Sequence, residues 1–254
     1  MLESIGRPVL RLTEDVGQVV LLLGLSGRAV VTGQLHWRNT LQQLARIGTE
    51  SVGLILVSSA FIGAVFTVQV TTEFSRLGAL KLIGGIVGLA MWRELSPIFT
   101  GLVVAGRVGA AITAEIGTMK VSEQIEALRA MAVDPDRYLA VPRIVAALIM
   151  VPLLTGVSDV VGFLAGLVIA VYVGKLNPNS YFSSAQNMLS LMDITGGLVK
   201  AALFGVLIAA VACHLGARAT AGAQGVGSAT TRTVVISFML IFTLNYILSV
   251  LLYS

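Results

Sequence analysis

The stretch MWRELSPIFTGLVVAGR, residues 91–107, is apolar enough for a membrane helix, but it contains Arg93, Glu94 and Arg107 and is interrupted by Pro97. Arg93 and Glu94 lie about 13 residues, or about 20 Å of helix, from the outer end of the span predicted here. That depth is too great for interface anchors. Because an intramembrane charge costs about 2.5–3.5 kcal/mol on insertion scales, we expect both side chains to face protein or a wet cavity.

The two charges cannot neutralise each other well, because adjacent residues on a helix point about 100° apart. Lys200, in a later apolar segment, is the basic residue at a comparable depth, and we predict that it neutralises Glu94. Arg93 would then be free to contact a lipid phosphate. The alternative is a salt bridge that only ties two helices together, and the residues alone leave both interpretations open.

Other chemistries lack their residues. Cys213 is the single cysteine, and His36 and His214 are isolated, so neither a disulfide framework nor a clustered metal site is expected. The chain has no GxxxxGK[ST], GxSxG or HExxH motif. We therefore predict no catalytic residue, no metal ligand and no bound cofactor, so active transport would need an ion gradient or a separate ATPase.

Composition predicts the fold class. The chain is 56% hydrophobic and 12% charged, with mean hydropathy +0.90, which indicates an integral membrane protein. Few aromatic residues and 27 glycines favour closely packed helices over a β-barrel. The net charge is +4, but the basic residues are scattered, which argues against nucleic-acid binding. We predict an all-α integral membrane protein.

Five segments are apolar over the roughly 20 residues that a bilayer requires. They lie at about 51–72, 80–117, 144–173, 197–216 and 233–252, and we interpret the second as one long or kinked span. The shorter apolar run 16–31 is expected to be an uncleaved interfacial helix, with a signal-peptide core as the alternative. The predicted domains are an N-terminal region, 1–48, and a five-span domain, 49–254.

The distribution of basic residues predicts the topology. With the N-terminus inside, eleven Lys and Arg residues flank the spans on the cytoplasmic side and three on the outer side. Between the third and fourth spans, residues 175–196 form either a short amphipathic helix on the outer surface or a plain connector.

The largest cytoplasmic segment between spans, 117–143, contains a helical pattern. Its apolar residues recur every three or four positions at Val121, Ile125, Leu128 and Met131. Ser122 is the predicted N-cap, and Asp134 before Pro135 is a stop signal. A helix of about 121–132 is too short to span a bilayer, so it lies on the membrane or binds a groove on a cytoplasmic partner.

Three stretches carry a family resemblance. The run ELSPIFTGLVVAGRVGAAITAEIGTMKVSEQIEALRAMAVDP from Glu94 to Pro135, with ATTRTVV at 229–235 and FIG at 61–63, resembles the MlaE family of ABC-transporter permeases over about 45–252. The resemblance implies a homodimer of five-span subunits that moves glycerophospholipids with two ATPase subunits and a ring of MCE-domain lipid-binding proteins. It also implies a bacterial inner membrane or a plastid inner envelope, with ATP bound by the partner ATPase.

The resemblance also implies two sets of site residues. The family's lipid-pocket positions fall on Phe66, Glu73, Leu77, Arg93 and Leu95, with Glu94 beside them and Lys200 in the fourth span. Glu73 departs from the mostly apolar pattern of that pocket. The 121–132 helix matches the family's coupling helix, which inserts into the ATPase, and its expected contact residues are Glu123, Gln124, Ile125, Leu128 and Met131.

The function hypothesis is therefore a permease subunit that provides a lipid path and is not itself an enzyme. One alternative is a secondary transporter driven by protonation of an intramembrane carboxylate such as Glu94, which would transport with only a proton gradient. The other is a membrane scaffold for an MCE protein, which would never co-purify with an ATPase.

Overall fold

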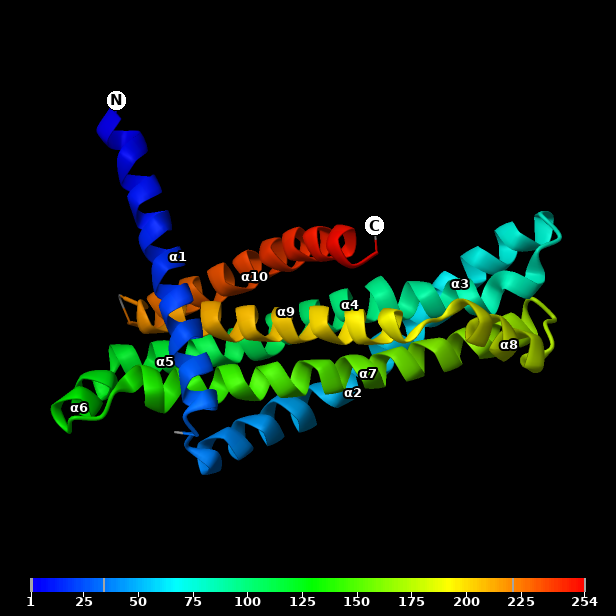
Figure 1. The fold of residues 1–254 in the computed structure, drawn as a ribbon. Helices are drawn as coiled ribbons and strands as arrows, with labels where there is room; N and C mark the ends of the chain where they lie inside the picture. The colour runs from blue at the N-terminus through cyan, green and yellow to red at the C-terminus, as the bar shows by residue number, and fades with distance from the viewer. Residues whose placement is uncertain (1, 34, 221, 254) are drawn as a thin grey trace. The chain divides into compact units, whose positions relative to one another are not determined.

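The computed structural model describes residues 2–33, 35–220 and 222–253, with side chains described from Thr13 onward in the first range. All regular elements of these residues are helical. The long helices are α1 (Leu2–Val31), α2 (Trp37–Arg76), α7 (Val141–Tyr172), α9 (Leu191–Ala217) and α10 (Gly222–Tyr253) (Figure 1). The predicted all-α fold is confirmed, and the run 16–31 lies within a helix.

Five segments of the described chain are long and apolar enough to cross a membrane, as predicted. They are Trp37–Arg76, Leu80–Val121, Asp136–Tyr172, Leu191–Ala217 and Gly222–Tyr253. Most of their ends lie beyond the predicted limits. Apolar patterning detects only the part of a helix that matches hydrocarbon, whereas backbone hydrogen bonding continues into polar flanking residues.

The segment Leu80–Val121 is one span, as predicted, but it is not a uniform α-helix. It comprises η1 (Leu80–Leu82), α3 (Ile83–Ala90), η2 (Met91–Leu95), α4 (Ser96–Val104), η3 (Ala105–Gly109) and α5 (Ala110–Val121). Both η2 and η3 are π-helical turns. This form is rare in proteins, and where it occurs it often lies at a functional site. Arg93 and Glu94 lie in η2, and Arg107 lies in η3, so the three charged residues of the 91–107 stretch coincide with widened turns.

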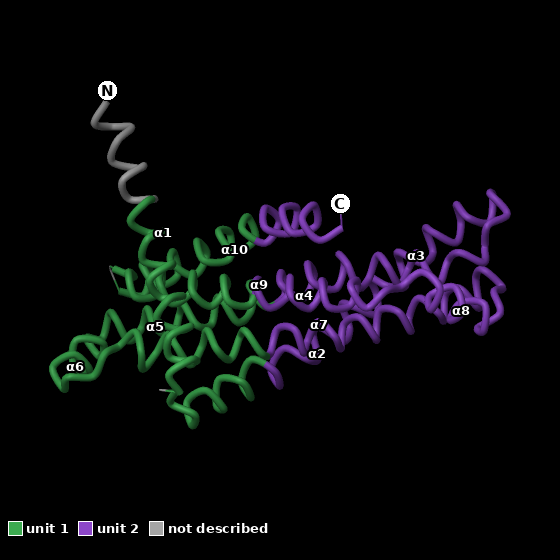
Figure 2. The backbone as a smooth tube through the Cα atoms, viewed as in Figure 1, with its two compact units in different colours: residues 1–47, 104–149, 205–240 green, residues 48–103, 150–204, 241–254 purple. Residues whose placement is uncertain are grey.

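Residue contacts divide the chain into two compact units (Figure 2). Unit 1 contains residues 1–47, 104–149 and 205–240, and unit 2 contains residues 48–103, 150–204 and 241–254. Every spanning segment contributes to both units. The predicted lipid-binding residues all belong to unit 2, and the predicted coupling residues all belong to unit 1.

Unit 2 contains the helix predicted as one of two possibilities for residues 175–196. This helix, α8 (Pro178–Met188), begins with the Asn177 side chain accepting a hydrogen bond from the Asn179 N–H. It packs on α3 (Figure 1), where a Cβ on Gly84 would lie 2.0 Å from the Tyr181 carbonyl oxygen. Burial raises the pKa of Tyr181 above its ordinary value. Its hydroxyl therefore stays neutral and donates to the Phe163 carbonyl, 3.2 Å away.

Unit 1 joins α5, α9 and α10 through buried threonines. The Thr113 hydroxyl of α5 lies 2.8 Å from the Thr233 hydroxyl of α10 and 3.2 Å from the Ala212 carbonyl oxygen of α9. Asp15 of α1 contacts the end of α9, where its carboxylate lies 3.0 Å from His214 Nε2 and also pairs with Arg218. These contacts attach α1 to the rest of unit 1.

Candidate functional site

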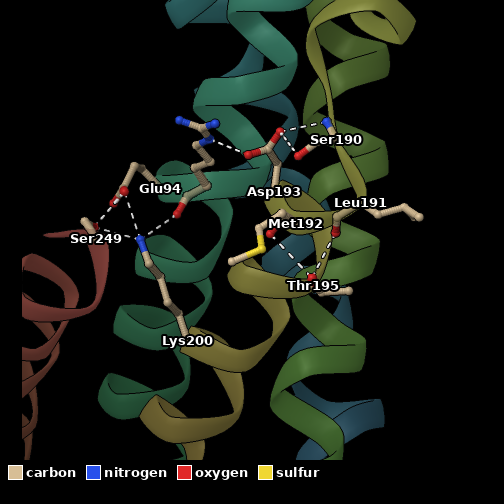
Figure 3. A network of polar contacts seen from close by, with 9 residues as sticks. Glu94, Ser190, Leu191, Met192, Asp193, Thr195, Lys200 and Ser249 are labelled. Atoms are coloured by element: carbon tan, nitrogen blue, oxygen red, sulfur yellow. Dashed lines mark hydrogen bonds and ion pairs between the residues drawn. The ribbon is translucent and has the colours of Figure 1, made fainter. Parts of the chain in front are cut away.

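A network of paired charges in unit 2 surrounds Glu94 (Figure 3). The Glu94 carboxylate accepts hydrogen bonds from Lys200 Nζ at 2.8 Å and from Asn245 Nδ2 at 2.7 Å. The Ser249 hydroxyl lies 2.7 Å from the same carboxylate. The predicted pairing of Glu94 with Lys200 is thus present in the structure, and α10 supplies two polar partners that the sequence reasoning did not include.

Lys200 is fully buried, and each of its three N–H donors has an acceptor. Nζ donates to Glu94, to the Ser249 hydroxyl at 2.7 Å and to the backbone carbonyl of Arg93 at 3.0 Å. That carbonyl needs an outside donor because Pro97, four residues later, has no N–H to offer it. Lys200 therefore compensates both a charge and a break in the helical hydrogen bonding.

Arg93 is not free, which corrects the sequence prediction. Its Nε donates to Asp193 Oδ1 at 2.6 Å, and its guanidinium lies 4.5 Å from the centre of the Tyr253 ring. Among the described residues, no hydrogen bond engages its Nη1 or Nη2 groups. The side chain is 36% exposed, so part of it is accessible.

Asp193 is positioned by the start of α9. Its second carboxylate oxygen accepts from the Ser190 backbone N–H at 2.7 Å and from the Ser190 hydroxyl at 2.9 Å (Figure 3). The sequence Ser190-Leu-Met-Asp193 has the spacing of a capping box, and an acidic side chain is favoured in the first turn of a helix. This pattern was the signal that could have identified the partner of Arg93.

The remaining predicted lipid-binding residues lie in two places. Phe66 and Leu95 are partly buried against the aromatic and aliphatic cluster of unit 2 that contains Phe163 and Tyr181. Glu73 and Leu77 are exposed near the end of α2, where Glu73 forms a 3.5 Å ion pair with Arg76. The structure brings Arg93, Glu94 and Lys200 together, whereas no described contact joins Glu73 or Leu77 to them.

The predicted coupling helix is shorter than expected. It is α6 (Gln124–Ala130), and Val121 belongs to the preceding helix α5. Ser122 is not its N-cap, because the Ser122 hydroxyl donates back to the Thr118 carbonyl. Glu123 precedes the helix with φ +60°, a left-handed conformation that turns the chain sharply between α5 and α6. An amphipathic pattern alone does not reveal this turn.

The apolar residues of α6, together with Met131 directly after it, are divided between the inside and the outside of unit 1. Ile125 is buried, Leu128 is half-buried, and Met131 is 65% exposed. Lys120 pairs with Glu126, and its ammonium group holds the pKa of that carboxyl below its usual value. The surface available to a partner therefore centres on Leu128 and Met131, with Glu123 and Gln124 also exposed.

A cavity of about 500 Å³ lies behind α6 in unit 1. Ile125 and Arg129 of α6 line it, as do Leu21 of α1 and His214 of α9. Within the described residues, no group of three or more His, Cys, Asp or Glu side chains could hold a metal ion. All residues that line this cavity belong to unit 1, and none of them belongs to the network around Glu94.

Five segments that are long and apolar enough to span a membrane define a multi-pass membrane protein. The family model described as permease MlaE matches residues 40–251, and the chain belongs to this family.

Named relatives agree with this assignment. A probable ABC transporter permease of Synechocystis sp. is 45% identical over 89% of this chain and 86% of its own length. The chloroplastic protein TRIGALACTOSYLDIACYLGLYCEROL 1 of Arabidopsis thaliana is 43% identical over 92% of this chain and 65% of its own length. A probable ABC transporter permease of Rickettsia typhi is 39% identical over 98% and 96% of the two chains. Bacterial and chloroplast relatives fit a bacterial inner membrane or a plastid envelope.

Proposed function

We propose that this chain is the permease subunit of an ABC transporter that moves glycerophospholipids, driven by a separate ATPase and supplied or relieved of lipid by an MCE-domain protein. Its family and the names of its relatives support a permease. The name of the Arabidopsis relative includes that of a lipid built on diacylglycerol, which agrees with a lipid substrate. The observation that carries the proposal is the half-satisfied guanidinium of Arg93.

Arg93 has the chemistry of a phosphate contact. Asp193 fixes its Nε, and the opposite edge of the guanidinium keeps donors that can bind phosphate oxygens in a bidentate manner. Asp193 accepts three hydrogen bonds and thereby orients the arginine. Phe66 and Leu95 offer apolar surface to acyl chains within the same unit.

The test separates a lipid contact from a structural salt bridge. Arg93→Ala alone would leave Asp193 buried and unpaired, so the informative variant is Arg93→Ala with Asp193→Asn. We expect this pair of substitutions to lower the amount of phospholipid that co-purifies while the subunit assembly is retained. The matched control is Arg137→Ala with Asp134→Asn, an exposed ion pair in unit 1. Unchanged bound phospholipid in the Arg93 variant would reduce the pair to a structural role.

Coupling to an ATPase is assigned to α6. A partner groove for this helix would receive Leu128 and Met131, so Leu128→Asp with Met131→Asp places two charges in an apolar contact. We expect the ATPase to be lost on purification, whereas Val31→Asp, at another exposed apolar residue of unit 1, should retain it. Ile125 is unsuitable for this test because its own chain buries it. Full retention of the ATPase by the α6 variant would exclude this docking mode.

A homodimer is part of the proposal. One five-span chain is small for enclosing a two-chain phospholipid, and a cavity shared across a two-fold axis is the economical solution. Counting the copies in an active, detergent-solubilised particle tests this, and activity from a single copy would contradict it.

The alternative of a proton-driven transporter based on Glu94 is disfavoured by the partners of that carboxylate. Lys200, Asn245 and Ser249 all contact it, so its charge is already compensated. Lipid transport by the purified chain with only a proton gradient would support that alternative.

A further inference from the structure

Asp159 is an intramembrane carboxyl that the network in unit 2 does not use. It is the only charged residue of α7 between Val145 and Tyr172, and it is 2% exposed. The four charges of the network pair with one another, Arg93 with Asp193 and Lys200 with Glu94. Asp159 is therefore left without a compensating cation among the described residues.

The surroundings of Asp159 are polar but uncharged. Ser96 of α4 is close enough to interact with the carboxyl. However, neither Asp159 Oδ1 nor Ser96 Oγ has a well-formed hydrogen bond. Thr100, one turn further along α4, also carries a buried hydroxyl oxygen without a partner. Three buried oxygen atoms on two neighbouring helices thus lack hydrogen-bond partners, which is unusual for a protein interior.

The register of the helices shows why α4 and α7 enclose this position. Side chains of the preceding segment reach close to glycines of α7, Met91 to Gly162 and Val87 to Gly166. These contacts run antiparallel, and continuing them places Ser96 within about two residues of the level of Asp159. The same Cβ on Gly162 would also lie 3.2 Å from the Ser59 carbonyl oxygen of α2. The α2 segment 51–72 contains no charged residue.

An ionised carboxylate is poorly tolerated in such a place. With no cation beside it and little water, its charge would lack the compensation that buried charges require. A protonated carboxyl is compatible with the site, because it is neutral and offers one O–H donor to the oxygen atoms around it. Ionisation therefore needs water or a cation to enter between α4 and α7.

We propose that Asp159 is a proton-binding site whose occupancy is linked to the packing of α4 against α7. The carboxyl holds its proton while the two helices are closely packed. When they separate enough to admit water, the O–H bond breaks, the electron pair remains on the carboxylate, and the proton passes to a water molecule. By linkage, protonation favours the closed packing and a higher pH favours the open one. This inference stands independently of the transported substrate.

Infrared spectroscopy of the full chain in phospholipid bilayers, with any subunits that co-purify, tests the proposal directly. A protonated carboxylic acid has a C=O stretching band above the amide I region, which shifts in D₂O. We expect this band at neutral pH, its reversible loss as the pH is raised, and its absence in Asp159→Asn. The matched control Glu73→Gln removes an exposed carboxylate and should leave the band unchanged.

A second variant keeps the test informative if Asp159→Asn folds poorly. Ser96→Ala removes the hydroxyl facing the carboxyl and should change the pH at which the band disappears. A band that persists at every pH at which the protein stays folded would show a permanently neutral acid and overturn the proposal. A carboxylate signal at neutral pH that responds to Na⁺ would also overturn it, in favour of a metal-cation site.

Discussion

The substitution Lys200→Met is expected to destabilise the chain, because it leaves the Glu94 carboxylate in unit 2 without its cation. Lys200 is fully buried and donates three hydrogen bonds, including the one to the Arg93 carbonyl. Removing one partner of a buried ion pair costs about 3–5 kcal/mol of unfolding free energy. Since the Glu94 side chain is 35% exposed, solvent screens part of its charge, and we expect about 3 kcal/mol, the lower end of that range.

The double variant Glu94→Gln with Lys200→Met should recover most of this loss, because no buried charge is left unpaired. Unfolding can be followed by denaturant titration in detergent micelles using tryptophan fluorescence, to which Trp92 contributes beside the network. The matched control is the exposed pair of Glu73 and Arg76, whose side chains are 65% and 72% exposed. Breaking such a surface pair should cost about 0–1 kcal/mol.

Two results would refute this reasoning. One is Lys200→Met unfolding at the same denaturant concentration as the control variant Arg76→Met. The other is a double variant no more stable than Lys200→Met alone, since the two charges would then not be balancing each other.

Two further predictions concern packing and pH. Gly197→Ala should lower stability by about 1–3 kcal/mol in the same titration, because a Cβ would lie 2.0 Å from the Trp92 carbonyl oxygen; Gly53→Ala, with nothing within 4 Å, should not. The hydrogen bond from Lys120 lowers the pKa of Glu126 in the folded chain below the value of 4.5 that applies to the unfolded chain. The pair therefore stabilises α6 fully at a pH above 4.5 and loses this effect as the pH falls through the lower, folded-state pKa. The protection factors of the α6 amides, which correct for the pH dependence of intrinsic exchange, should therefore fall over that window, and in Glu126→Gln this fall should be absent. Protection factors that fall in Glu126→Gln as in the unmodified chain would contradict the assignment.

The spans and the pairing of Glu94 with Lys200 could be predicted because each follows from one physical requirement that the sequence alone can be tested against. A bilayer demands about 20 apolar residues, and a deep carboxylate demands a cation at the same depth. Lys200 was the residue that met this condition. Asn245 and Ser249 could not be predicted in the same way, because a neutral polar side chain in a span carries no charge that requires a specific partner.

The partner of Arg93 was missed for a different reason. Hydropathy assigns Asp193 to the connector before the fourth span, whereas α9 begins at Leu191 and places the aspartate in its first turn. Hydropathy averages locate the centre of a span better than its ends. The local signal is the capping-box spacing from Ser190 to Asp193. It is found only when the sequence is searched for helix N-termini and not for hydropathy alone.

The apolar pattern of residues 121–132 also did not predict the turn before α6 or the burial of part of its apolar face. Apolar residues at steps of three or four predict a helical face, but not which molecule covers that face. In the structure the left-handed Glu123 reorients the chain after α5, and Ile125 is then buried within unit 1. Leu128 and Met131 keep surface for a partner, as does Val121, which belongs to α5.

Pro97 explains why the charges lie where they do. By lacking an N–H, it leaves the Arg93 carbonyl without its helical donor, and this break follows the π-helical turn that contains Arg93 and Glu94. Lys200 donates to that carbonyl and to Glu94 at once, and the close approach of α9 is possible because Gly197 has no Cβ facing the Trp92 carbonyl. A carbonyl without a donor and a carboxylate without a cation are each costly in a membrane, but one buried ammonium group compensates both. Because Lys200 pairs with Glu94, Arg93 pairs with Asp193 through its Nε, and its Nη groups make no hydrogen bond with the described residues.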